Sequence, residues 1–148
     1  MGKSKEMISI RGRGQQELVV LLAEAQSKHG YLSNVLLTNM AKSLGLSVSY
    51  VYGVATFYSF LSTKPLGRNA IRICKSLPCF LKNSQAIIES IEREIGIKPG
   101  ETTPDGKFSF QLTNCMGACD KAPAMMINNE VHTDLTPNKI SQILKSYK

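Results

Sequence analysis

All four cysteines of this 148-residue chain fall in two tight pairs, and this pairing restricts what the chain can form more than any other feature. Four residues separate Cys74 from Cys79, three separate Cys115 from Cys119, and 35 lie between the pairs. Because a chain can turn back on itself over four or five residues, both thiols of a pair can face one centre. Two such loops, brought together by a fold, supply four soft ligands of the kind that zinc and iron–sulfur clusters bind.

Disulfides and inert thiols are the alternatives to a metal or cluster site. The N-terminal residues contain no apolar segment followed by a small-residue cleavage site, so we expect an intracellular, cytoplasmic protein without a secretory signal. In a reducing compartment, paired cysteines indicate metal or redox chemistry rather than disulfides. A thioredoxin-type catalytic dithiol needs C-x-x-C, which the sequence lacks. We therefore favour a metal or cluster site, and we identify no catalytic residue.

The cysteines alone leave both zinc and a two-iron cluster open. Structural zinc sites usually have a tight C-x₂-C knuckle in each half. Spacings of four and three residues, with a long separation between the pairs, fit the wider footprint of a two-iron cluster better. The two histidines, His29 and His132, lie far from the pairs in sequence, and we expect both at the surface.

Residues 15–65 are expected to form a bundle of three short helices. Apolar side chains three and four residues apart predict helices at 15–29, 34–44 and 48–60. Serines precede the second and third helices as caps, and glycines follow the first and second. These residues are Ser33, Ser47, Gly30 and Gly45.

The second and third predicted helices, with a glycine turn between them, also fit a DNA-binding helix-turn-helix. A recognition helix displays arginine, lysine, asparagine or glutamine to the bases, whereas residues 47–63 contain none of these. This segment favours a protein contact, and a metal-cluster-sensing DNA-binding protein is kept only as the alternative. Its large apolar residues either dock a partner or fill the chain's own core: Val51, Val54, Phe57 and Phe60.

The sequence Lys64-Pro-Leu-Gly67 breaks the helical pattern and predicts a domain boundary. We expect a mobile tail over residues 1–14, the bundle over 15–65 and a second domain over 66–148. No apolar run approaches the roughly 20 residues that span a bilayer, so no membrane insertion is expected. The net charge of +7 is spread over both halves of the chain without a basic run, so it does not by itself indicate nucleic acid.

The second domain is expected to be a mixed sheet with helices packed on it. One helix should begin at Cys79 and run through residues 81–95, and another should follow Thr136 and Pro137. This order of elements is the minimal thioredoxin-like plan, which makes the chain an α+β protein. Both cysteine pairs then follow strands at the same end of the sheet. The predicted strands are residues 69–74, 108–112, 124–127 and 131–133.

Three motifs resemble those of a known family. They are Val51-Tyr-Gly-Val-Ala-Thr-Phe-Tyr58, Pro65-Leu-Gly-Arg68, and Cys115-Met-Gly-Ala-Cys119 followed by Ala122-Pro123. From Leu18 onward the chain resembles the thioredoxin-like [2Fe–2S] ferredoxin subunit of complex I (NADH dehydrogenase) and of NAD(P)-linked or electron-bifurcating hydrogenases and formate dehydrogenases. It differs at Lys75-Ser-Leu-Pro78, where the family usually has a glycine and a threonine. This difference bears on hydrogen bonding around the cluster and therefore on its potential.

The resemblance implies an N-terminal three-helix bundle followed by a thioredoxin-like [2Fe–2S] ferredoxin domain, with one [2Fe–2S] cluster. It implies a non-catalytic electron carrier that exchanges single electrons with the FMN of a partner that binds NAD(P). Further iron–sulfur subunits are expected in the same complex, for which we favour a soluble bacterial oxidoreductase such as a bifurcating hydrogenase. No Gly-rich nucleotide loop occurs in the chain, in keeping with flavin and nicotinamide on the partner. The implied ligands are Cys74, Cys79, Cys115 and Cys119.

Overall fold

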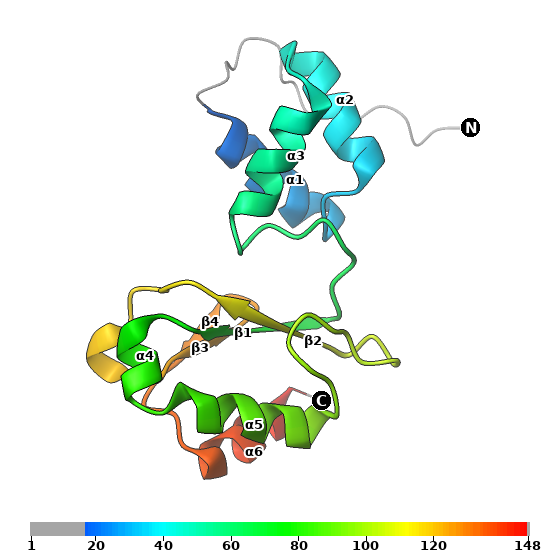
Figure 1. Cartoon of the computed structure of the whole chain (residues 1–148). Coiled ribbons are helices and arrows are strands. Elements are labelled where there is room, and N and C mark those ends of the chain that lie inside the picture. Colours follow the sequence, from blue (N-terminus) through cyan, green and yellow to red (C-terminus); the bar gives the residue numbers. More distant parts are fainter. Residues whose placement is uncertain (1–16, 148) are drawn as a thin grey trace. The chain divides into compact units, whose positions relative to one another are not determined.

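The computed structural model describes residues 17–147 (Figure 1). Internal contacts divide the chain into two compact units, with the division between Pro65 and Leu66. The tail expected over residues 1–14 lies outside the described residues.

The first unit contains the three predicted helices. Ser33 and Ser47 cap the second and third of them, because their hydroxyl groups accept hydrogen bonds from backbone N–H groups in the first turn. The third helix ends three residues earlier than predicted, since Tyr58 takes an extended conformation. The helices are α1 Leu18–His29, α2 Asn34–Leu44 and α3 Val48–Phe57.

Helix α3 divides its apolar residues between the core and the surface. Val51 is buried with leucines of α1 and α2, and Val54 packs against the same cluster. Phe57 instead has 77% of its surface exposed, and Phe60 is exposed as well. The core interpretation therefore holds for the two valines, whereas Phe57 at the end of α3 and Phe60 beyond it lie at the surface.

The second unit is built on a four-stranded sheet in the order β2-β1-β3-β4. Strands β1 and β2 are parallel, and the remaining pairs are antiparallel. Because β1 and β2 run in the same direction, Cys74 at the end of β1 lies opposite Thr113 at the end of β2. The strands are β1 Asn69–Cys74, β2 Phe108–Thr113, β3 Met125–Ile127 and β4 Glu130–His132.

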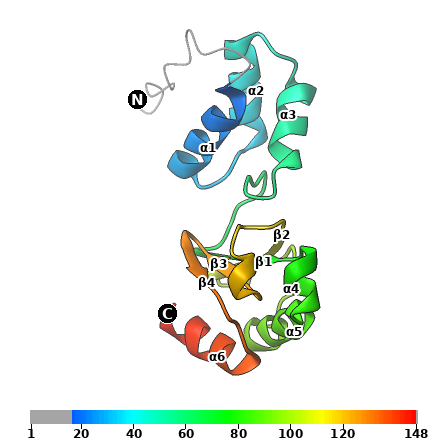
Figure 2. The ribbon, with the colours of Figure 1, turned by 90° about the vertical axis from the view of Figure 1, so that its left-hand side faces the viewer.

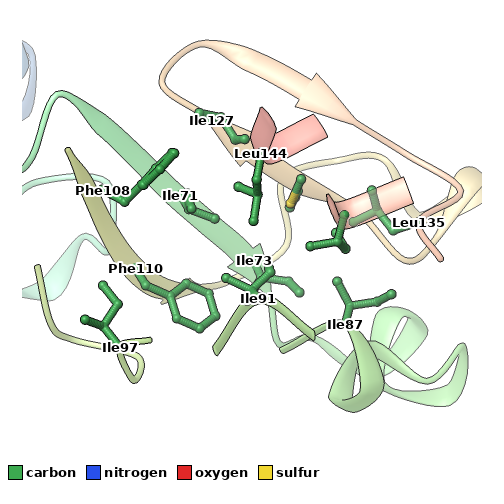
Figure 3. Close-up of a cluster of buried hydrophobic side chains, with 12 residues drawn as sticks. Ile71, Ile73, Ile87, Ile91, Ile97, Phe108, Phe110, Ile127, Leu135 and Leu144 are labelled. Carbon is green, nitrogen blue, oxygen red and sulfur yellow. The ribbon is translucent and has the colours of Figure 1, made fainter. Parts of the chain in front are cut away.

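Two helices cover one face of this sheet, α5 Ser84–Ile95 and α6 Pro137–Ser146 (Figure 2). Their apolar side chains meet those of the strands in a single core, shown in Figure 3. The mixed sheet and the helices that pack on it confirm the predicted α+β plan. The labelled members of the core include Ile71, Ile73, Ile87, Ile91, Phe110 and Leu144.

The single helix predicted from Cys79 to residue 95 is wrong, because the chain forms two helices there. Helix α4 covers Leu77–Leu81, and α5 begins only at Ser84. Between them, Asn83 has a φ of 64°, in the left-handed region that asparagine tolerates better than most residues. Helical periodicity continues on both sides of this break and therefore did not predict it. As a consequence, α4 is a separate element whose side chains need not follow the buried face of α5.

His132 is also less exposed than predicted. It is half-buried in β4, and its Nε2 lies 3.1 Å from the hydroxyl oxygen of Tyr147. That hydroxyl donates a hydrogen bond to the carboxylate of Glu130. The histidine therefore belongs to a small polar contact between β4 and the C-terminal residues, whereas His29 is exposed as expected.

We expect Gly67→Ala to lower the free energy of unfolding by about 1–3 kcal/mol, in the range of overpacked sites. A Cβ atom at Gly67 would lie 2.9 Å from the carbonyl oxygen of Gly106 and 2.9 Å from the carbonyl carbon of Phe108. These are backbone atoms, so relief requires movement of the chain beside β2. Unfolding in urea, followed by circular dichroism, measures the change.

Gly53→Ala in α3 is the matched control for this substitution. A Cβ atom there would have nothing within 4 Å, so a gain of about 0.5–1 kcal/mol is expected from the higher helix propensity of alanine. A Gly67→Ala protein as stable as the wild type would contradict the close backbone approach.

Tyr147 should make the protein less stable at alkaline pH. Burial and the Glu130 carboxylate raise the pKa of Tyr147 to about 12 from its ordinary value of 10.0. The contribution of protonated Tyr147 to the free energy of unfolding is complete below about pH 10 and is lost as the pH rises through about 12. The reason is that Tyr147 of the unfolded chain loses its hydroxyl proton at a lower pH than Tyr147 of the folded chain. Over this interval the free energy of unfolding should fall more steeply for the wild type than for Tyr147→Phe. Parallel pH profiles in urea unfolding would count against this assignment.

Candidate metal centre

The two cysteine-bearing loops lie at one edge of the sheet in the second unit. Cys74 is the last residue of β1, and Cys79 follows in α4. Cys115 follows β2 after one residue, Asn114. Cys119 begins the short 3₁₀ helix η2 Cys119–Lys121. All four are free thiols. Parallel pairing of β1 with β2 thus places both loops where the sequence predicted them.

Burial differs between the two pairs. Cys74 and Cys79 are buried and pack with Ala124, which precedes β3. Cys115 and Cys119 are exposed. Partly buried apolar residues complete this small cluster, namely Met116, Ala118 and Ala122. The centre therefore has one wall inside the protein and one wall at the surface.

In the exposed pair, the Sγ atoms of Cys115 and Cys119 are 3.1 Å apart. The backbone N–H of Gly117 donates a hydrogen bond to Cys115 Sγ at 3.4 Å. Gly117 has a φ of 89°, which an L-residue adopts only with strain, so this turn requires glycine. The backbone of this loop therefore already donates to a cysteine sulfur.

The thiols influence one another across the two loops. The bond from the Cys119 thiol, together with the N–H of Gly117, lowers the pKa of Cys115. The same bond, then partial desolvation of the sulfur and the charges of Cys115, Cys79 and Cys74, raise the pKa of Cys119 to about 11. All four sulfurs therefore lie within electrostatic range of one another.

Cys79 obtains its backbone donor from an unexpected place. Burial raises the pKa of the Cys79 thiol, and a hydrogen bond from the backbone of Ala124 opposes this rise. Cys79 lies in the first turn of α4, as its third residue, but the backbone donor to its sulfur comes from Ala124. A backbone donor in a distant loop carries no residue-type signal, so Ala124 could not be found from the sequence.

The donor set fits an iron–sulfur cluster chemically. It offers four soft sulfur ligands, two backbone donors to sulfur and an apolar inner wall, which are the features that bind and tune such clusters. Over residues 17–147, no three or more His, Cys, Asp or Glu side chains are arranged to hold one metal ion. A two-iron cluster divides its four ligands between two metal ions and does not need three at one point.

Comparison with known proteins gives a consistent result. The sequence profile of the thioredoxin-like [2Fe–2S] ferredoxins matches residues 4–148. A subunit of the NADH-quinone oxidoreductase of Escherichia coli (strain K12) is 42% identical over 123 residues, which cover 83% of this chain and 74% of that protein. The corresponding subunit from Buchnera aphidicola is 44% identical over 123 residues, or 83% of this chain and 76% of that protein.

Among solved structures, the chain is similar to part of an NAD⁺-reducing [NiFe]-hydrogenase in the air-oxidised state. The TM-score is 0.74 at 24% sequence identity, and the match covers 88% of this chain and 22% of the hydrogenase chain. At this identity the similarity shows the fold alone. Within the part of the chain that the structure describes, no helix combines the length and apolar character needed to cross a membrane.

Proposed function

The chain belongs to the thioredoxin-like [2Fe–2S] ferredoxin family, and we propose that it is the electron-carrying subunit of an NAD(P)-dependent oxidoreductase complex. The observation that carries this proposal is the gathering of four thiols from two loops at one edge of the sheet. When bound, the cluster supplies storage for a single electron. Among residues 17–147 we identify no group for catalysis of a further chemical step.

The two cysteine pairs occupy different positions in the proposed ligand set. Cys74 and Cys79 would hold the cluster from the buried side, beside Ala124. Cys115 and Cys119 would hold it from the exposed side. The N–H groups of Gly117 and Ala124 stabilise negative charge on the ligand sulfurs, which favours thiolates and adjusts the potential.

The proposed electron partner is a subunit that binds FMN and oxidises or reduces NAD(P)H. Similar chains are named as subunits of NADH-quinone oxidoreductase and as part of an NAD⁺-reducing hydrogenase, which supports a partner of this class. Further iron–sulfur subunits, a soluble bacterial complex such as a bifurcating hydrogenase, and a cytoplasmic location remain predictions from the sequence.

An apolar surface next to the proposed ligands supports this partner. We define the α4 face as Leu77, Phe80 and Leu81, whose side chains are 66%, 60% and 73% exposed. Cys79, on the same short helix, is buried, so this surface lies directly beside the centre. Exposed lysines flank the helix, which favours a partner surface with carboxylates around an apolar patch: Lys75 and Lys82.

No observation on residues 17–147 favours the DNA-binding alternative. Helix α3, the candidate recognition helix, exposes aromatic and hydroxyl side chains and has no cationic residue with which to contact phosphate. Its exposed side chains include Tyr50, Tyr52 and Phe57.

Protein purified without oxygen tests the proposal directly. We expect about two irons and two sulfides per chain, and after dithionite reduction a rhombic EPR signal of spin one-half. In the complex isolated through a tag on this chain, NADH or NADPH should produce the same signal, and FMN should be present. One zinc per chain without colour would overturn the cluster, and a loaded chain that no flavoprotein reduces would overturn the partner.

A further inference from the structure

Arg72 is a buried cation close to the proposed centre. It lies in β1, between Gln111 of β2 and Met126 of β3, and only 6% of its surface is exposed. Its side chain is therefore almost wholly removed from solvent. A charged side chain in such a position is costly to bury.

Arg72 and Cys74 lie on the same face of β1. Side chains alternate along a strand, and Ile71 and Ile73 point into the core formed with α5 and α6 (Figure 3). Cys74 instead packs in the separate cluster with Cys79 and Ala124. Two residues along a strand span about 7 Å, so the backbone of Arg72 is that close to a proposed ligand.

The charge of Arg72 is fixed. Burial lowers the pKa of Arg72, yet the guanidinium group keeps its proton at any physiological pH because its ordinary pKa is so high. Four thiolates give a two-iron cluster a net negative charge, which increases by one when the cluster accepts an electron. A nearby positive charge therefore stabilises the reduced form more than the oxidised form.

We propose that Arg72 raises the reduction potential of the cluster through its buried positive charge, an inference that rests on the proposed function. Arg72 acts on the electron affinity of the centre without being a ligand. Lys75 is nearer to the ligands in sequence but is exposed, so water and salt screen its charge. Burial makes Arg72 the stronger and less salt-dependent influence.

Redox titration followed by EPR tests this role at low and high salt. We expect Arg72→Met and Arg72→Gln to shift the midpoint potential to more negative values at both salt concentrations. Arg72→Lys, which keeps the charge, should remain closer to the wild type. Arg93→Met is the control, because Arg93 is an exposed arginine on α5. It removes the same charge at the surface and should leave the midpoint unchanged.

Three results would overturn the inference. The first is an unchanged midpoint in a loaded neutral variant, and the second is an equal shift in Arg72→Lys. The third is loss of the cluster from all three Arg72 variants, which would assign the residue a purely structural role. A wild-type chain that holds no cluster would overturn the proposed function itself, whereas equal midpoints in loaded proteins leave that function intact.

Discussion

Cys74→Ser and Cys79→Ser are each expected to abolish cluster binding, with iron and sulfide near zero and no visible absorption. Both side chains are buried and pack with Ala124, so solvent cannot readily supply a replacement ligand on that side. A serine hydroxyl is a harder ligand than a thiolate and keeps its proton at neutral pH, so it replaces cysteine poorly as a ligand of iron. Metal and sulfide analysis with a visible spectrum measures the loss.

The exposed pair provides a graded comparison. Cys115→Ser and Cys119→Ser should also lose most of the cluster, but residual absorption is expected because water has access to this side. Asp120→Asn is the control, since Asp120 is exposed and follows Cys119 directly. Full absorption and an unchanged EPR signal in Cys79→Ser would show that Cys79 is not a ligand.

Phe80→Asp should slow reduction of the cluster by the flavoprotein at least about tenfold while the cluster itself stays intact. The substitution places a charge in the middle of the α4 face, and loss of an aromatic anchor at an interface typically costs about 2 kcal/mol or more. The carboxylate would also face the acidic partner surface that the flanking lysines predict. The rate at which NADH reduces the cluster is measured with the flavoprotein at a limiting concentration, and it reports on docking. EPR of the dithionite-reduced protein reports on whether the cluster is still bound.

Val131→Asp is the matched control for the α4 face. Val131 is another exposed large apolar residue of the second unit and lies on β4 instead of beside the cysteines. The same change there should leave the rate within about twofold, because single surface substitutions away from an interface have small effects. Wild-type rates in Phe80→Asp, or equal losses in both variants, would place the docking surface elsewhere.

Much of the fold could be predicted because local signals agreed with it. Ser33, Ser47 and Thr136 all cap helices as expected, since each side chain satisfies an N–H that the helix leaves free. The alternation around Ile71 and Phe110 likewise predicted strands, which the structure confirms. The single buried face predicted for residues 69–74 is wrong, because every residue of β1 is buried. Where the local sequence pattern and the tertiary packing favour the same residue types, the sequence is sufficient to predict the helix or strand.

Other features depend on tertiary structure and left no readable pattern. The break at Asn83 is one residue in a left-handed conformation within a helical stretch. Val51 and Phe57 are both apolar, so only packing could assign one to the core and one to the surface. The pairing of cysteines from both loops was predicted from strand order, but the ligand set and the partner stay proposals.

The unequal burial of the two cysteine pairs bears on how the protein acquires its cluster and how the centre meets oxidants. The isoleucine-rich core lies between the sheet and its helices and includes none of the cysteines, so the domain can fold before it receives its cofactor. A cluster delivered from solvent would meet Cys115 and Cys119 first, because these two thiols are exposed. Oxidants in solvent would likewise meet the exposed pair before the buried pair.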